Sequence, residues 1–289
     1  MASTDQRRPE NVAGDFFVDS TCIDCDTCRW MAPATFHHAG GQSAVHFQPR
    51  SADERRRALQ ALVSCPTASI GTVEKHAMRE VLESFPIPID GDVHHCGYHH
   101  ESSFGAASYL LRRPGGNVLV DSPRFSAPLV RRLEALGGVD TMFLTHRDDV
   151  GDHERFHSHF GCERILHADD AKGDLRGLER LLEGTEPVAL DDELLVLPVP
   201  GHTRGSCVLL WRETYLFSGD HVAWSDRLGQ IYAFRRACWY DWGVQTESMR
   251  RLATYDFEWI LPGHGRRCHF EREAMRGEMA RGVAWMEGA

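Results

Sequence analysis

The residues best suited to chemistry are cysteines near the start of the chain and histidines and aspartates after residue 100. Cys22, Cys25 and Cys28 stand in the run CIDCDTC, with the spacing C-x2-C-x2-C. Three thiolates at this spacing let one tight loop cover a face of a cubane iron–sulfur cluster. Ala32 stands where a two-cluster protein has its next cysteine, so we expect one [4Fe-4S] cluster. Cys65, which is followed by proline, is the expected fourth ligand.

The elements around these cysteines form a small α+β pattern. SAVHFQP alternates like a strand, and SADERRRALQALVS has the periodicity of an amphipathic helix, with Ser51 or Asp53 as its cap. The segment resembles a single-cluster ferredoxin-like domain over residues 14–75. Two alternatives remain. The cysteines could bind zinc, although a zinc site would more often show two C-x2-C pairs. The segment could also be a ferredoxin-like module that has lost its cluster.

Five apolar, strand-like runs after residue 100 each end in a polar turn. Each turn supplies one residue that could bind a cation: Asp121, His146, His202, Asp220 and His264. Neighbouring strands bring their ends together, so we expect one edge of a sheet to carry these side chains. Imidazole and carboxylate ligands suit zinc, iron or manganese, and one or two such divalent ions are expected.

The order of these turns resembles the metallo-β-lactamase fold over residues 80–285. The motifs GHTRGS, LFSGD and LPGHG carry the resemblance. It implies an α/β chain in which an αββα sandwich at 93–289 follows the ferredoxin-like domain, with a linker at 76–92. The metal site would lie in the cleft between the sheet edges. Helices are expected at 126–136, 152–160, 175–182, 242–255 and 271–287.

The stretch THRDDVGDH departs from the family motif His-x-His-x-Asp-His. The motif fits neither when it is aligned on His146 nor when it is aligned on the pair Asp152-His153, unless a gap is allowed. In a gapped alignment Asp148, or else Asp149, replaces the missing histidine. The resemblance then implies two sites that share Asp220: one with His146, Asp148 and His202, the other with Asp152, His153 and His264. The alternative is a solvated acidic turn and a single metal ion. Asp121 would support the ligands from behind, or only cap its turn.

The usual chemistry of the resembling family is hydrolysis by a metal-bound hydroxide, which Asp152 would orient and deprotonate. Esters, thioesters, lactones and phosphoesters are the implied substrates. The alternative is a redox enzyme whose diiron centre receives electrons from the cluster. A carboxylate at residue 148 favours iron or manganese, and the chain resembles flavodiiron proteins in having a carboxylate at that place. A third hypothesis is an electron-transfer or sensor protein without catalysis.

The remaining sequence narrows the partners. IYAFRRACWYDWG supplies Arg235, Arg236 and Trp239 as candidate substrate contacts, although these arginines could equally be surface groups and the tryptophans core. The 289 residues carry a net charge of −10, which disfavours nucleic acid and anionic membrane as partners. No apolar run reaches membrane-spanning length, so we expect a cytoplasmic protein. A small-molecule substrate and an electron-donor reductase are the expected partners; the oligomeric state is not indicated.

Overall fold

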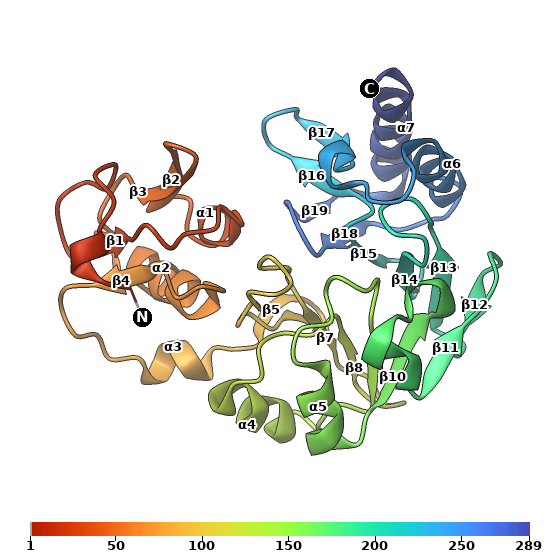
Figure 1. Ribbon diagram of the computed structural model, residues 1–289, viewed down its shortest axis with the longest axis horizontal. Helices are drawn as coiled ribbons and strands as arrows, with labels where there is room; N and C mark the ends of the chain where they lie inside the picture. Colours follow the sequence, from red (N-terminus) through yellow and green to blue (C-terminus); the bar gives the residue numbers. More distant parts are fainter. Residues whose placement is uncertain (1) are drawn as a thin grey trace.

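Figure 1 shows the computed structural model of the chain, which describes residues 2–289. Seven α-helices are assigned in this range: α1 Thr27–Met31, α2 Ala52–Ser64, α3 Arg79–Glu83, α4 Ala127–Ala135, α5 His153–Phe160, α6 Trp242–Leu252 and α7 Arg272–Gly288. Four short 3-10 helices accompany them: η1 Thr4–Gln6, η2 Ala168–Asp170, η3 Gly173–Gly177 and η4 Arg235–Ala237.

Two large sheets stand face to face. The first has seven strands in the order β11 Arg180–Leu182, β10 Glu163–His167, β9 Thr141–Phe143, β8 Val118–Val120, β7 Tyr109–Leu111, β6 Val93–His95 and β5 Ile87–Asp90. The second has six strands in the order β12 Val188–Ala189, β13 Leu194–Pro198, β14 Cys207–Trp211, β15 Tyr215–Gly219, β18 Trp259–Pro262 and β19 Cys268–His269. A separate hairpin pairs β16 Ala223–Ser225 with β17 Gln230–Tyr232.

The two sheets bury a shared apolar core, and helices cover their outer faces. Val120 and Phe143 of the first sheet pack in one cluster with Leu209 and Phe217 of the second. Helices α4 and α5 cover the outer face of the first sheet, and α6 and α7 cover that of the second. This is the αββα sandwich that the sequence predicted.

The N-terminal domain is small and built around α2. β1 Phe16–Val18 pairs with β4 Ile70–Thr72, and β2 Phe36–Ala39 forms a hairpin with β3 Gln42–Val45. Helix α2 starts with a capping box, in which the Ser51 hydroxyl accepts from the Glu54 amide and the Glu54 carboxylate accepts from the Ser51 amide. The predicted helix and its cap are therefore confirmed.

Within residues 2–289, one expected helix is absent, and the expected linker contains a strand. Residues 175–182 do not form a helix: η3 ends at Gly177, and Arg180–Leu182 is β11, which pairs in parallel with β10. Pairing of this segment with the edge of the sheet outweighs a weak helical pattern that Gly177 interrupts. The expected linker at 76–92 contains β5, which pairs with β6 and so belongs to the first sheet.

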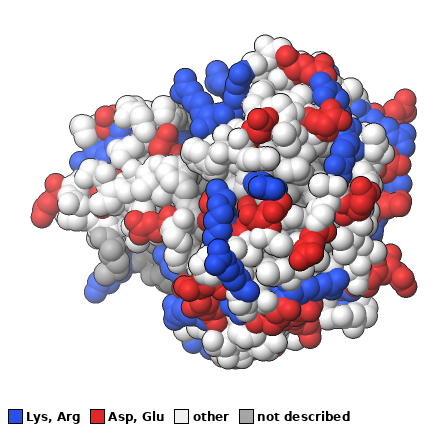
Figure 2. Space-filling model, turned by 45° about the vertical axis from the view of Figure 1, so that its right-hand side comes forward, with Lys and Arg blue, Asp and Glu red and all other residues white. Residues whose placement is uncertain are grey.

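None of the helices in residues 2–289 combines the length and the apolar composition that a membrane crossing needs. The face drawn in Figure 2 mixes acidic and basic side chains and carries no broad basic surface.

Candidate metal centre

The strand ends place imidazoles and carboxylates at one end of the sandwich, as expected. His146 follows β9, His202 follows β13, Asp220 follows β15 and His264 follows β18. Because β8 and β9 run parallel, and β15 and β18 run parallel, the carboxyl ends of each pair meet at the same edge. The turns from the two sheets then face each other across the cleft.

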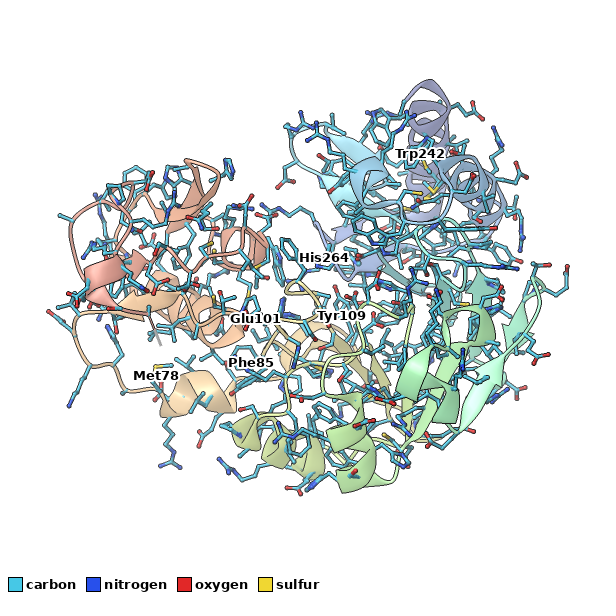
Figure 3. The ribbon with its side chains drawn as sticks, viewed as in Figure 1. Met78, Phe85, Glu101, Tyr109, Trp242 and His264 are labelled. Atoms are coloured by element: carbon cyan, nitrogen blue, oxygen red, sulfur yellow. The ribbon has the colours of Figure 1, made fainter. Side chains whose placement is uncertain are left out.

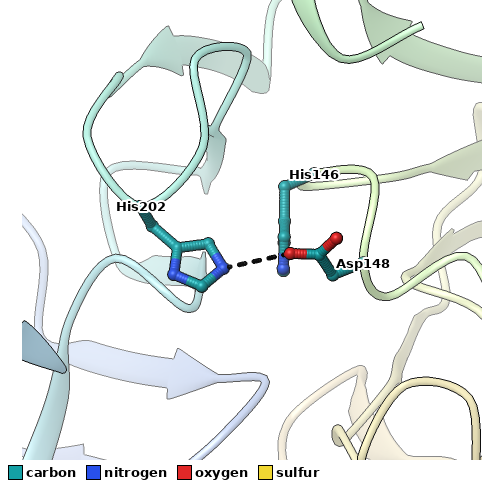
Figure 4. Close-up of side chains that lie close together, drawn as sticks. All are labelled: His146, Asp148 and His202. Carbon is teal, nitrogen blue, oxygen red and sulfur yellow. Dashed lines mark ion pairs between the residues drawn. The ribbon is translucent and has the colours of Figure 1, made fainter. Parts of the chain in front are cut away.

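The first group of ligands is His146, Asp148 and His202 (Figure 4), whose ligand atoms lie within 4.8 Å of one another. The His202 Nε2 lies 3.6 Å from Asp148 Oδ2 and 3.7 Å from Asp220 Oδ2. Tetrahedral ligands about 2.1 Å from a zinc ion are separated by roughly 3.4 Å. The separations are therefore slightly wider than those of a filled site, and small movements would close them on a cation.

The second group is His146, Asp149 and Asp220, again within 4.8 Å. The His146 Nε2 is 3.9 Å from both Asp149 Oδ2 and Asp220 Oδ2. His264 adjoins this group, with its Nδ1 2.7 Å from Asp220 Oδ1. A Cβ atom on Gly263 would lie 2.8 Å from Asp149 Oδ2 and 3.0 Å from Asp220 Oδ1, so only glycine lets both carboxylates reach the centre.

The donor atoms fit one or two divalent cations because several are buried without any hydrogen-bond partner. These are His146 Nε2, His202 Nε2 and Asp149 Oδ2. An unpaired buried polar group costs about 1–3 kcal/mol, and a bound cation removes that cost. Three imidazoles and three carboxylates suit zinc, iron or manganese, and the high share of carboxylates favours the harder ions.

The charges of the side chains at the centre also favour the binding of a cation. Burial and the neighbouring Asp220 raise the pKa of Asp149 well above its ordinary value. Burial opposes ionisation of Asp220, but His264 holds the pKa of that carboxyl below its usual range. Burial likewise opposes the charged form of His264, yet Asp220 raises its pKa to about 10. The charge of a protonated His264 thus offsets the neighbouring carboxylates, as a bound metal ion would.

Asp121 and Thr145 orient His146. The Thr145 amide and hydroxyl donate to Asp121, at 2.8 and 3.0 Å. The hydroxyl proton is used there, so Thr145 Oγ1 accepts from the Nδ1–H of His146, 3.0 Å away. The Nε2 lone pair of His146 is then directed at the centre. Burial raises the pKa of Asp121 to about 7, an effect that the Thr145 hydrogen bonds oppose and the Asp220 charge adds to.

Asp170, which was not among the residues predicted from the sequence, joins the two ligand loops. It is fully buried. Its carboxylate accepts from the Arg147 amide at 3.1 Å, the Thr203 hydroxyl at 2.5 Å and the Gly205 amide at 3.0 Å. The loop of His146 and the turn of His202 are therefore fixed to one carboxylate. Its place after β10, a further strand end, was the available signal in the sequence.

The structure does not bring Asp152 and His153 to the centre, which corrects the gapped alignment. Asp152 Oδ2 accepts from the Phe125 amide at 2.7 Å, and His153 Nδ1 lies 3.1 Å from the Arg164 guanidinium. Gly151, with a φ of +40°, turns the chain away, so that α5 begins at His153. Asp149 stands at the centre in place of these two residues.

A cavity of about 930 Å³ opens over the centre. Asp148, Asp149, His202, Asp220 and His264 line it, as do Arg147 and an aromatic wall of Phe104, Tyr232, Phe234 and Trp239. Trp239 is thus where the sequence predicted it. Arg235 and Arg236 are exposed and do not line the cavity; Arg235 lies over the Trp242 ring instead.

The four cysteines expected to hold the cluster lie together in the N-terminal domain. Cys28 and Cys65 are buried, Cys22 and Cys25 are half-buried, and none forms a disulfide. Burial first, and then the charges of the other thiols, raise the pKa of Cys25 to about 11. The Ser69 amide donates to Cys65 Sγ at 3.3 Å. Four close thiols with little access to water fit a cubane cluster, which supplies the charge that would keep them ionised.

Exchanging Asp149 for asparagine tests whether this carboxylate is a ligand. We expect Asp149→Asn to weaken binding of a divalent ion at least about tenfold, because an amide oxygen carries no charge. Asp152→Asn, the matched control, should change affinity less than about twofold, since the new side-chain oxygen can still accept from the Phe125 amide. Chelator competition with metal analysis measures both. A larger loss of affinity in Asp152→Asn than in Asp149→Asn would show that the gapped alignment is correct.

Removing the Thr145 hydroxyl tests the orientation of His146. In Thr145→Val, His146 loses its Nδ1 partner, and metal affinity should fall by about 10–100-fold. Thr145→Ser keeps the hydroxyl and should bind nearly as tightly as the wild type. Equal losses in both variants would mean that packing, and not the hydrogen bond, is what matters.

Comparisons with known proteins agree with both halves of the chain. Residues 18–72 match the model of the 4Fe-4S single cluster domain of Ferredoxin I. A hydroxyacylglutathione hydrolase of Rhodospirillum rubrum is 35% identical over 118 residues, which cover 39% of this chain. The match spans 46% of that enzyme, less than half its length.

Two solved metallo-β-lactamases share the fold of the second domain. The FIM-1 enzyme from Pseudomonas aeruginosa, in its mono-zinc form, aligns with a TM-score of 0.52 at 17% identity, over 68% of this chain and 93% of its own. The DIM-1 enzyme aligns with a TM-score of 0.50 at 16% identity, over 67% and 95%. The chain therefore joins a single-cluster 4Fe-4S ferredoxin-type domain to a domain of the metallo-β-lactamase fold.

Proposed function

We propose that this protein is a metal-dependent hydrolase of small carbonyl esters, with thioesters as the favoured class. The observation that carries the proposal is the set of buried, unpaired ligand atoms at the base of a large cavity. The similarity to a hydroxyacylglutathione hydrolase favours a thioester, which water would convert into a carboxylic acid and a thiol.

The side chains at the centre divide the work of this reaction. Divalent ions, when bound, lower the pKa of a water molecule and polarise the substrate carbonyl. Asp149 takes the role that was predicted for Asp152 from the sequence. Its Oδ2 is buried, has no hydrogen-bond partner and borders the cavity, so it can orient the attacking water. Burial raises the pKa of Asp149, and a bound cation would lower it again, which would keep the carboxylate ionised and able to orient the water.

Arg147 is the residue best placed to hold an anionic group of the substrate. It lines the cavity, and its guanidinium lies 3.7 Å from Asp148 and 3.8 Å from Asp170, beyond close hydrogen-bonding distance. Its donors are therefore free to bind a carboxylate in two-pronged fashion. Phe104 and Trp239 on the cavity wall would pack against the apolar part of the substrate.

Replacing Arg147 tests this assignment. With a thioester that carries a carboxylate, Arg147→Gln should raise KM about tenfold and leave kcat nearly unchanged, because the contact binds ground state and transition state alike. With an uncharged thioester the variant should match the wild type. Arg235→Gln is the control for loss of a surface arginine and should have no effect. An equal loss on both substrates would contradict anion recognition.

A redox enzyme with a diiron centre is the second candidate. Two observations favour it: the centre is rich in carboxylates, and Cys25 of the cluster loop lines the same cavity as the metal ligands. The cluster would then pass electrons from a reductase to iron, whereas hydrolysis needs none.

Metal analysis of protein purified without oxygen separates the two functions. The hydrolase proposal expects the second domain to hold ions that support thioester hydrolysis when zinc alone fills it, with the activity surviving removal of the cluster. Iron in the second domain, a spin-coupled diiron signal and reduction through the cluster would instead establish the redox function and overturn the hydrolase.

A further inference from the structure

The turn Glu101–Gly105 lies between the cluster-binding loop and the metal centre. Figure 3 places Glu101 and His264 at the centre of the molecule, where the N-terminal domain meets the sheets. At one side of the turn, the Phe104 carbonyl lies 3.4 Å from His264 Nε2. At the other, a Cβ atom on Gly105 would lie 2.8 Å from Cys25 Cβ and 3.0 Å from Cys25 Sγ. Two successive residues thus contact a ligand of each centre.

Thr27 adds a hydroxyl that can serve either neighbour. The Oγ1 of this buried residue accepts from the Cys25 thiol at 3.4 Å and donates to the Gly105 carbonyl at 3.3 Å. It also lies 3.0 Å from His99 Nδ1. The Gly105 carbonyl already accepts from His99 Nδ1 at 2.6 Å. A thiolate at Cys25 no longer donates. The Thr27 hydroxyl can then turn its proton from the Gly105 carbonyl, which keeps the His99 hydrogen bond, to the sulfur. Hydrogen bonds to cluster sulfurs are one of the factors that set the reduction potential of an iron–sulfur cluster.

A second contact ties the same two loops. Asp26, next to Cys25, forms an ion pair with Arg266, two residues beyond His264, at 3.0 Å. The cluster loop and the His264 turn are thus joined from both sides, and a change in one has a physical route to the other.

We propose that Thr27 and the Glu101–Gly105 turn couple the two centres, so that filling the metal centre raises the reduction potential of the cluster. His264 presents Nδ1 to Asp220 and Nε2 to the Phe104 carbonyl. If Nδ1 served as a ligand, the filled centre would hold the imidazole in place, and its Nε2–H would keep donating to that carbonyl. This fixes the turn, keeps Gly105 against Cys25 and leaves the Thr27 hydroxyl to the sulfur. The extra negative charge of the reduced cluster is then better stabilised. The coupling rests on the two ligand sets, and it holds for hydrolysis and redox chemistry alike.

The test compares the cluster potential with the second domain empty and filled with Zn²⁺, which is redox-silent. Full-length protein carrying its cluster is titrated with dithionite, which supplies one electron per cluster, and the reduced cluster is followed by electron paramagnetic resonance. In the wild type, Zn²⁺ should raise the reduction potential of the cluster by at least about 59 mV. For a one-electron couple this is about a tenfold change in the equilibrium constant for reduction. Thr27→Val should have a lower potential and lose most of this response, whereas Thr27→Ser should behave as the wild type.

Two results would overturn the coupling: a wild-type potential that ignores Zn²⁺, or a Thr27→Val variant that keeps the whole response. The second would show that the ion's charge acts through space alone. If Thr27→Val does not retain its cluster, amide hydrogen exchange of the wild type decides instead. Zn²⁺ should slow exchange in residues 101–107 and 22–28 together, and unchanged exchange in 22–28 would refute the link.

Discussion

The arrangement of the second domain depends on burying ligand atoms that have no partner within the protein. Asp149 and Asp220 are acidic groups set side by side against Gly263, with the unpaired nitrogens of His146 and His202 beside them. Such a group is unfavourable by itself, because Asp149 Oδ2 and the two nitrogens have lost their water and gained no hydrogen bond, and only Asp220 is paired, with His264. One or two cations reverse that balance. The stability of this end of the sandwich and its chemistry therefore have the same source.

The scaffold holds this unfavourable arrangement by fixing the backbone behind it. Asp170 joins the loop of His146 to the turn of His202, and Asp121 holds Thr145, which orients His146. Both carboxylates are buried and accept several hydrogen bonds. They remove freedom from the ligand loops before any ion arrives, so that binding does not have to order them.

The two domains share a cavity, and this changes how the cluster is understood. A cluster held far from the substrate could be only a structural support. Here Cys25 lines the cavity beside His264, and the Glu101–Gly105 turn contacts both. The state of the cluster and the occupancy of the metal centre can therefore influence each other, whichever reaction the cavity supports.

The sequence by itself determined the joining of a ferredoxin-type domain to an αββα sandwich, and it pointed to the four cysteines and to the candidate ligands His146, His202, Asp220 and His264. These follow from local signals: cysteine spacing, apolar runs of strand length and glycine-flanked turns. It did not determine which aspartate completes the centre. That depends on the backbone at Gly151, which turns α5 away and leaves Asp149 pointing inward while Asp152 binds the Phe125 amide. Only the tertiary structure could decide this, since the direction of a loop side chain is set by what the loop packs against. The same holds for Asp170 and for the contact of Gly105 with Cys25, because both join segments that are remote in sequence and leave no periodic pattern.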